Sequence, residues 1–405
     1  MIRDPASAAM SAPPPHFLTL VAMTALATLS LNMILPSLPA IAAEMEASYA
    51  TVNLMIGGYL AMTALVQIIA GPVSDRVGRR PVVLTALGVF TLASALCLLA
   101  TDIRLLVAAR FLQAAVIACS AMSLAIIRDT DSTGQAAARM ARLSMAMAVA
   151  PMIGPVLGGA LEQVFGWRAA FAVYTVAGFG LLALVWRNLG ETGTSRGGGF
   201  GAMARDMACL ARIARFWGYA ICSVFSVGAF FIFLTGAPLV ASRAFGLSPA
   251  AMGLVLGSIT AGFFLGSALS SRFSTRAGLV RMVLAGRIVA CIGLSLGLVA
   301  YGLGLMTLVT YFGATVFVGI GNGLTTPSAN AGMLSLRPEL AGNAAGLSGA
   351  MIVAGGAGLS TLTGLILRPE SAAPMLLALL LAACLIGLMA ALWLWRDGGR
   401  AGAEI

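Results

Sequence analysis

Residues 71–81 read Gly71-Pro72-Val73-Ser74-Asp75-Arg76-Val77-Gly78-Arg79-Arg80-Pro81 and hold three arginines and one aspartate. One apolar run ends near Ala70 and the next begins at Val82, so we expect a very short loop joining two membrane helices. Such a density of charge in a short loop requires a reason beyond solubility. We therefore expect this loop to act at the cytoplasmic surface of a membrane.

The composition of the chain is that of a membrane protein. Of its 405 residues 60% are hydrophobic and 9% are charged, which is too apolar for a soluble globular protein. The net charge of +10 comes from arginine alone. Because the arginines stand in loops between apolar runs, they indicate membrane topology rather than nucleic-acid binding. The expected partner is the lipid bilayer, and no nucleic acid is expected.

Apolar runs predict an all-α membrane protein with twelve transmembrane helices. Residues 190–216 are glycine-rich and basic and form the only long polar connection. The chain is therefore expected to have two six-helix halves, 1–189 and 217–405, joined by a cytoplasmic linker at 190–216. The expected spans are 17–39, 50–70, 82–100, 104–127, 140–161, 168–189, 217–240, 249–270, 280–301, 305–327, 344–367 and 373–395.

Arginines also predict the orientation. With the N-terminus inside, the cytoplasmic segments hold eighteen arginines and the outer loops hold four. The positive-inside rule then places both termini in the cytoplasm, and we expect a multi-pass protein of a bacterial inner membrane. The first apolar run is too long for a signal-peptide core and is interpreted as an uncleaved helix. Arg110 and Arg287 lie inside spans.

A weak internal repeat accompanies the division into halves. Asp75-Arg76 at the end of the second span matches Ser271-Arg272 at the end of the eighth, an offset of 196 residues. Tandem six-span repeats are typical of transporters that rock one half against the other around a central site.

With this topology, four motifs resemble those of the major facilitator superfamily, and within it the twelve-span drug/proton antiporters of the Bcr/CflA type. Residues 71–80 fill every fixed position of the signature G-x-x-x-D-R-x-G-R-R/K between spans two and three. The other three are Arg110-Phe111-Leu112-Gln113 with Arg128-Asp129 in the fourth span, residues 150–159 in the fifth, and residues 32–39 in the first. The resemblance covers the whole chain, is sharp in the first half, and implies the major facilitator fold.

By this resemblance, the 71–80 loop is a conformational latch. Asp75 is expected to face Arg79 and Asp129, and to meet the N-terminal end of the eleventh span near Gly342-Asn343. A carboxylate at a helix N-terminus gains about 0.3–1 kcal/mol, and such a contact between halves can form in one state and break in the other. The alternative is charge placed for topology alone. The latch set is Gly71, Asp75, Arg76, Gly78, Arg79, Arg80 and Asp129.

Arg110 and several uncharged polar residues are candidates for a substrate cavity. An unpaired arginine inside a span costs at least about 2.5 kcal/mol, so it should face a wet cavity or the bundle interior. The alternatives are snorkelling to the outer surface for Arg110 and hydrogen bonds between helices for the other residues. The cavity candidates are Asn32, Asn53, Tyr59, Arg110, Gln113, Asn322 and Asn330.

The fifth-span motif predicts a bendable, tightly packed seam that limits leakage, because its glycines allow close helix contact. By resemblance, this motif is associated with antiporters. Its residues are Gly154, Pro155, Gly158 and Gly159.

The chain departs from the Bcr-like group at Asn32, where that group commonly has an aspartate as the expected proton carrier. None of its fourteen acids stands in the middle of a predicted span. Three accounts remain for proton coupling, which is implied by resemblance alone: coupling through Asp75 and Asp129, a titrating substrate, or a facilitator without proton coupling. A cavity with Arg110 and no acid fits neutral or anionic compounds better than dications.

The sequence lacks the residues that other classes of function require. The six cysteines show no CxxC pair and His16 is the only histidine, so neither a metal nor a cofactor is expected. A membrane-embedded enzyme would need a nucleophile with a base or an H-E-x-x-H motif, and ATP-driven export would need a G-x-x-x-x-G-K-[ST] loop. A proton-pumping subunit would need intramembrane lysines and glutamates. The preferred hypothesis is a monomeric secondary transporter that exports small amphipathic drug-like or metabolite molecules.

Overall fold

The computed structural model describes residues 16–131, 133–192, 200–337 and 340–401, and within them the secondary structure is entirely helical. Eleven helical segments of this part of the chain are long and apolar enough to cross a membrane, and Val149–Phe165 is a shorter apolar helix. With that shorter segment the count reaches the expected twelve. The prediction of an all-α membrane protein is confirmed.

The first six spans are formed by α1 to α8, and two of these spans are broken. Pro36 and Pro39 stand at the starts of the short helices of the first span, where the missing amide hydrogen of proline costs little. The elements are α1 (Phe17–Asn32), η2 (Leu35–Ser37), α2 (Leu38–Glu44), α3 (Tyr49–Val77), α4 (Arg79–Leu99), α5 (Ile103–Gln113), η3 (Ala114–Val116), α6 (Ile117–Thr130), α7 (Thr133–Phe165) and α8 (Arg168–Asn188).

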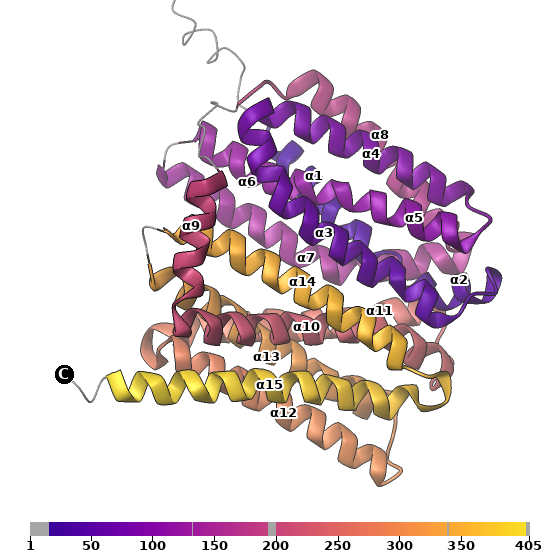
Figure 1. Ribbon diagram of the computed structural model, residues 1–405. Helices are drawn as coiled ribbons and strands as arrows, with labels where there is room; N and C mark the ends of the chain where they lie inside the picture. Colours follow the sequence, from indigo (N-terminus) through magenta and orange to yellow (C-terminus); the bar gives the residue numbers. More distant parts are fainter. Residues whose placement is uncertain (1–15, 132, 193–199, 338–339, 402–405) are drawn as a thin grey trace, which may run out of the picture.

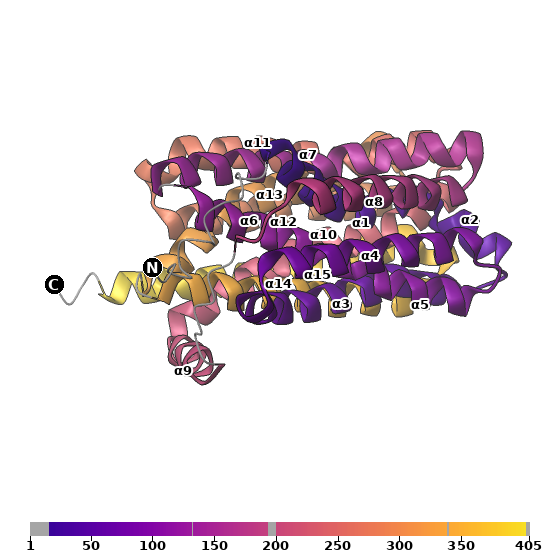
Figure 2. The ribbon, with the colours of Figure 1, turned by 90° about the horizontal axis from the view of Figure 1, so that it is seen from above.

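The remaining spans follow α9 (Phe200–Ala211), a helix inside the predicted linker. It contacts α10 and α14 and lies across the spans at one end of the bundle, where α15 also finishes (Figures 1 and 2). The later elements are α10 (Ala214–Arg243), α11 (Pro249–Ala277), α12 (Leu279–Gly302), α13 (Leu308–Ser335), α14 (Ala341–Ile366), η5 (Pro369–Ser371) and α15 (Ala372–Ala401). We call this end of the bundle the Gly78 end and the opposite one the Glu44 end.

The charged stretch at residues 71–81 is not the loop that the sequence suggested. Helix α3 continues to Val77 and α4 begins at Arg79, so Gly78 alone separates the two helices. Its φ of 99° is a conformation that a residue with a side chain rarely adopts. Asp75 and Arg76 occupy the last helical turn, because charge marks an exposed position and does not by itself end a helix.

The second half repeats this turn at Gly278, whose φ is 83°. Helices α3 and α11 each contain 29 residues, start after Ser48 and Ser248, and end at the two glycines. Equivalent residues are therefore 200 positions apart, from Gly78 to Gly278, and not 196. The expected offset was wrong because it aligned Arg76 with Arg272. The turn requires a glycine, and the glycines at the two turns are Gly78 and Gly278.

Helices α1 to α8 form one group and helices α10 to α15 the other. The two groups of helices meet along two antiparallel pairs, α3 with α14 and α7 with α11 (Figure 1). In the second pair the backbones touch. A Cβ atom on Gly159 would meet the carbonyl oxygen of Pro249, and one on Gly253 would meet the carbonyl oxygen of Pro155. Small residues permit such an approach in a bilayer, where no hydrophobic force drives helices together.

Candidate functional site

Arg79 organises a charged cluster at the Gly78 end. Its Nη1 lies 2.6 Å from Oδ1 of Asp75, and its Nε lies 3.2 Å from Oδ2 of Asp129. Nη1 also donates to the hydroxyl of Ser74. The Arg79 side chain is 6% exposed whereas that of Asp75 is 47% exposed. The structure thus brings the three expected residues together around a buried guanidinium, with Asp75 on the solvent side.

Glu191, just beyond α8, is a member of this cluster that was not predicted from the sequence. Its carboxylate accepts hydrogen bonds from the backbone amides of Arg79 at 2.7 Å and Arg80 at 3.3 Å. These are the first amides of α4, which have no partner inside the helix. A side chain at Gly78 would overlap the same carboxylate. Glu191 lies more than 100 residues from these amides, so no local spacing could reveal it.

Arg80 strengthens the same connection between α4 and α8. Its Nη2 donates to the carbonyl oxygen of Trp186 at 2.8 Å, and its guanidinium lies 5.6 Å from the centre of the Trp186 ring. Arg76 stands in the last turn of α3. The expected partner of Asp75, at Gly342-Asn343, lies outside the residues whose side chains the structure describes.

Helices α3 and α14 touch closely near the Glu44 end. A Cβ atom on Gly57 would meet Oγ1 of Thr361, and one on Gly364 would lie 2.8 Å from Cβ of Asn53. Asn53 is 1% exposed, and neither polar atom of its amide has a hydrogen-bond partner within the described ranges. Asn53 therefore lies at a contact between the two groups of helices.

The same helix faces separate toward the Gly78 end. Gly71 follows Asn53 by 18 residues and Gly346 precedes Gly364 by 18, which is five α-helical turns and so the same face. A Cβ atom on Gly71 or on Gly346 would have nothing within 4 Å. The pair of helices thus forms a wedge that is closed at the Glu44 end.

Arg110 lies in a buried polar network of α1, α3 and α5. Its Nη1 donates to Oε1 of Gln113 at 2.6 Å, and its Nη2 donates to the carbonyl oxygen of Ser30 at 2.6 Å. The guanidinium lies 4.3 Å from the ring centre of Tyr59, whose hydroxyl is 2.6 Å from that of Ser30. Arg110 is 0% exposed, which excludes snorkelling. Three of the cavity candidates are therefore brought together.

Asn32 lies near this network on the first span. Its Nδ2 donates to the carbonyl oxygen of Thr28 at 2.8 Å. A Cβ atom on Gly154 would lie 2.8 Å from Cβ of Asn32, and one on Gly158 would meet the carbonyl oxygen of Met33. The fifth-span motif thus packs on both the first span and α11. Asn330 is a partly buried position of α13.

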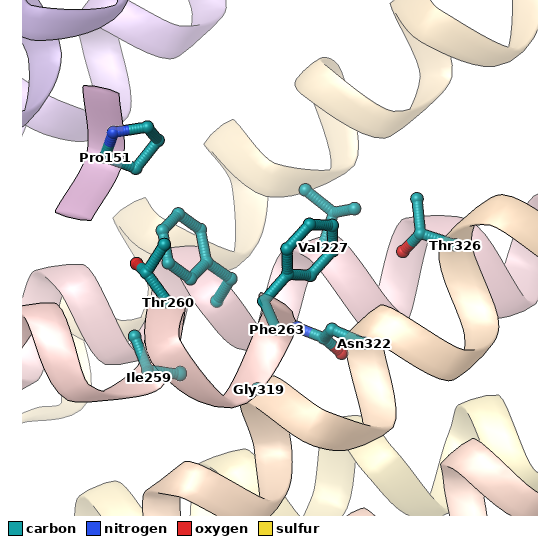
Figure 3. A pocket seen from close by; sticks show the side chains of 9 residues that line it. Pro151, Val227, Ile259, Thr260, Phe263, Gly319, Asn322 and Thr326 are labelled. Atoms are coloured by element: carbon teal, nitrogen blue, oxygen red, sulfur yellow. The ribbon is translucent and has the colours of Figure 1, made fainter. Parts of the chain in front are cut away.

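A cavity of about 220 Å³ lies where α7, α10, α11 and α13 meet (Figure 3). Its wall is mostly apolar. Asn322 is the cavity candidate that belongs to this wall, and it lies on α13 one turn before Thr326. The lining residues are Pro151, Val227, Phe230, Ile259, Thr260, Phe263, Gly319, Asn322 and Thr326.

Behind the cavity, Arg287 of α12 is also 0% exposed. Its Nη2 donates to Oδ1 of Asn322 at 2.8 Å, and its Nε donates to the hydroxyl of Thr325 at 3.0 Å. The hydroxyl of Ser226 donates to the same Oδ1 at 2.7 Å. From the sequence, Arg287 was expected inside a span and no role was predicted for it, although a charge inside a span is as costly for Arg287 as for Arg110.

In the described part of the chain, apolar spans form a bundle with buried polar networks between them and a wedge between α3 and α14, which is the architecture of a multi-pass membrane protein. The profile of the Major Facilitator Superfamily matches residues 20–361 of this chain. The chain belongs to this family, whose members carry small-molecule substrates. The match agrees with the resemblance noted from the motifs and with the expectation of a transporter rather than an enzyme.

Curated relatives come from several bacteria. The uncharacterized MFS-type transporter YdgK of Bacillus subtilis is 34% identical over 61% of this chain and 63% of its own length. A chloramphenicol resistance protein of Pseudomonas aeruginosa is 32% identical over 53% of this chain and 51% of its own length. A bicyclomycin resistance protein homolog of Haemophilus influenzae is 28% identical over 91% of this chain and 93% of its own. The alignments with the first two thus span about half to two thirds of each relative.

Solved structures share the fold at low sequence identity. A peptide transporter, POT, bound to sulfate has a TM-score of 0.76 and 14% identity, with 99% of each chain covered. A bacterial homolog of the human lysosomal transporter Spinster, in an inward-facing and occupied conformation, has a TM-score of 0.74 and 18% identity, with 94% and 96% covered.

The Glu191 contact can be tested by removing its carboxylate. We expect Glu191→Ala to lower the free energy of unfolding by about 0.5–2 kcal/mol, the usual effect of losing a helix N-cap. The measurement is the thermal unfolding midpoint of the purified protein in detergent. Glu370→Ala, which removes an exposed acid in η5, is the matched control. Equal midpoints for the two variants would contradict the capping role.

Proposed function

We propose that this protein is a secondary transporter that exports small amphipathic drug-like or metabolite molecules by alternating access. It would act as a monomer in a bacterial inner membrane, with both termini and the Gly78 end in the cytoplasm. The supporting observation is the wedge between α3 and α14, closed at the Glu44 end. Halves 1–189 and 217–405, joined by the linker at 190–216, would rock about this contact around a central site.

In the opposite state, the α3 and α14 faces would close at the Gly78 end. Asp75 follows Gly57 by 18 residues and Asn343 precedes Thr361 by 18, so five helical turns carry that contact to Asp75 and Asn343. The Asp75 carboxylate would then exchange Arg79 for the N-terminus of α14, where free amides and the helix dipole favour a negative charge. This exchange is the proposed latch.

The relatives suggest which molecules to assay first. Two of them are named for resistance to chloramphenicol and to bicyclomycin, both small molecules. An apolar cavity with a few polar groups suits such compounds. Export of these two drugs is therefore the first activity to measure.

A second candidate is a facilitator or exporter of neutral or anionic metabolites without proton coupling. The observation that favours it is the amide at Asn32, 2% exposed, in the place of the expected acid. An amide exchanges no proton in the physiological pH range. Within the described ranges, neither Arg110 nor Arg287 forms an ion pair with a carboxylate.

Rocking can be tested with a cross-link across the open end of the wedge. We expect Gly71→Cys with Gly346→Cys to form a disulfide on oxidation during turnover and to stop transport, with recovery on reduction. A disulfide needs Cβ atoms about 3.5–4.5 Å apart, which requires closure of the Gly78 end. Both cysteines are introduced into a protein that carries Cys209→Ser, because Cys209 is exposed and the other five cysteines are buried.

The matched control pairs Gly71→Cys with Gly180→Cys on α8, another glycine with open space at its Cβ position. Rocking does not bring these two positions together, so no cross-link is expected. Absence of the Gly71–Gly346 cross-link under turnover, or full transport by the cross-linked protein, would contradict alternating access about this wedge.

The latch predicts that Asp75→Asn slows transport while folding and membrane insertion remain intact. Losing a coupling free energy of 1–3 kcal/mol changes an equilibrium by about 5–150-fold, so we expect at least about a fivefold lower export rate. Asp102→Asn is the control, because asparagine caps a helix as well as aspartate does at the start of α5. An export rate of Asp75→Asn equal to that of the wild type would contradict the latch role of Asp75.

Proton coupling can be decided in proteoliposomes. If the protein is an antiporter, an imposed pH gradient should accelerate chloramphenicol or bicyclomycin movement against the proton flow, and an ionophore should abolish the acceleration. If it is a facilitator, the initial rate should be the same with and without the gradient. The second result would restrict the function to uncoupled transport.

A further inference from the structure

We propose that the cavity between α7, α10, α11 and α13 is a binding subsite for an oxygen acceptor on an uncharged or anionic amphipathic molecule. Arg287 would set this preference by acting through Asn322. The inference rests on the proposed transport function, because it names the class of molecule carried, and it assigns a role to a charge that the latch does not use.

The wall of the cavity supplies hydrogen-bonding groups without a charge. Val227, Phe230, Ile259 and Phe263 form apolar surfaces that suit the ring or chain of an amphipathic molecule. The hydroxyl oxygens of Thr260 and Thr326 are buried and have no hydrogen-bond partner among the described residues. Because buried polar groups are normally paired, these hydroxyls are available to a ligand.

Asn322 presents a donor to this cavity. A guanidinium can only donate, so the Asn322 atom that Arg287 contacts at 2.8 Å must be the amide oxygen. The hydroxyl of Ser226 donates to the same oxygen at 2.7 Å, which fixes the side chain further. The amide nitrogen remains for a ligand and can only donate. Figure 3 shows Asn322 beside Phe263, with Thr326 on the same side of α13.

The charge of Arg287 should favour an acceptor that carries negative charge. The residue is 0% exposed, and Nη1 has no hydrogen-bond partner within the described ranges. Among the described residues, none that lines the cavity carries a carboxylate. In a low-dielectric interior an uncompensated cation acts strongly on nearby charges, and its bond to Asn322 polarises the amide that faces the ligand. A cationic ligand would be repelled.

A purely structural role is the alternative for Arg287, since it also binds Thr325 and so ties α12 to α13. The two roles differ in their effect on selectivity. Loss of a structural tie weakens the binding of every ligand alike. Loss of the charge weakens anion binding, leaves neutral acceptors nearly unchanged and improves cation binding.

The test uses three naphthalene probes of nearly equal shape: 2-naphthoate, 2-naphthamide and 2-naphthylmethylammonium. Binding to the purified full-length protein in detergent is measured by calorimetry. For the wild type, we expect the dissociation constants of the carboxylate and the amide to be at least about tenfold lower than that of the ammonium. Arg287→Gln should lower carboxylate affinity about tenfold and change amide affinity less than about threefold.

Three further variants separate charge from packing. Arg287→Lys should keep the order of the probes, because it keeps the charge. Thr325→Val removes the structural contact but leaves the Asn322 bond, and it should keep the order too. Asn322→Asp replaces the donor with an acid, and it should abolish carboxylate binding and improve ammonium binding even if Arg287→Gln does not fold.

The outcomes distinguish this inference from the transport proposal. An equal effect of Arg287→Gln on all three probes, or no binding of any probe by the wild type, would overturn the subsite even if chloramphenicol is exported. Selective binding with the expected variant pattern, combined with no export of chloramphenicol or bicyclomycin, would support the subsite and contradict the proposed export of these drugs.

Discussion

The structure depends on close backbone contact between its two groups of helices at the Glu44 end. Lipid tails are as apolar as leucine side chains, so helices in a bilayer associate through packing and hydrogen bonds. Gly159 against Pro249 and Gly253 against Pro155 provide this packing on α7 and α11, and Gly57 against Thr361 provides it on α3 and α14. Because these contacts lie toward one end, they form a natural pivot. A side chain at any of these glycines would separate the helices that the pivot must hold.

The two buried guanidiniums have a common physical feature. Arg110 binds carbonyl and amide oxygens of α1 and α5, and Arg287 binds an amide oxygen and a hydroxyl of α13. Each thus satisfies part of its hydrogen-bonding capacity with dipoles, which solvate a charge without neutralising it. Within the described ranges neither guanidinium is paired with a carboxylate, so each contributes an uncompensated positive charge to its surroundings. This positive charge is the physical reason to expect that acceptors and anions, rather than cations, occupy the transport path.

Features that depend on local pattern could be predicted from the sequence, and features that depend on distant contacts could not. Runs of apolar residues predicted the membrane-spanning helices. The cost of a charge in a bilayer predicted that Arg110 would face the interior of the bundle or a wet cavity. The end of α3 was placed too early, because charge at Asp75 was mistaken for a loop. Glu191 and the pairing of Arg287 with Asn322 were missed, since each joins elements far apart in the chain and no spacing rule connects them. The cytoplasmic orientation and the roles of the latch residues stay predictions.

Glu191 also explains why Asp75 is available to move. Asp75 precedes Gly78 by three residues in the chain, and the first amides of α4, just after Gly78, are a favourable site for a carboxylate. Glu191 already occupies those amides, so the contact of Asp75 is the Arg79 guanidinium, which Asp129 and Ser74 also hold. If Asp75 left this cluster, Arg79 would keep a carboxylate partner and a hydroxyl. Breaking the Asp75 contact therefore leaves no unpaired buried charge on Arg79, and a carboxylate held in this way can exchange partners between two states of the protein.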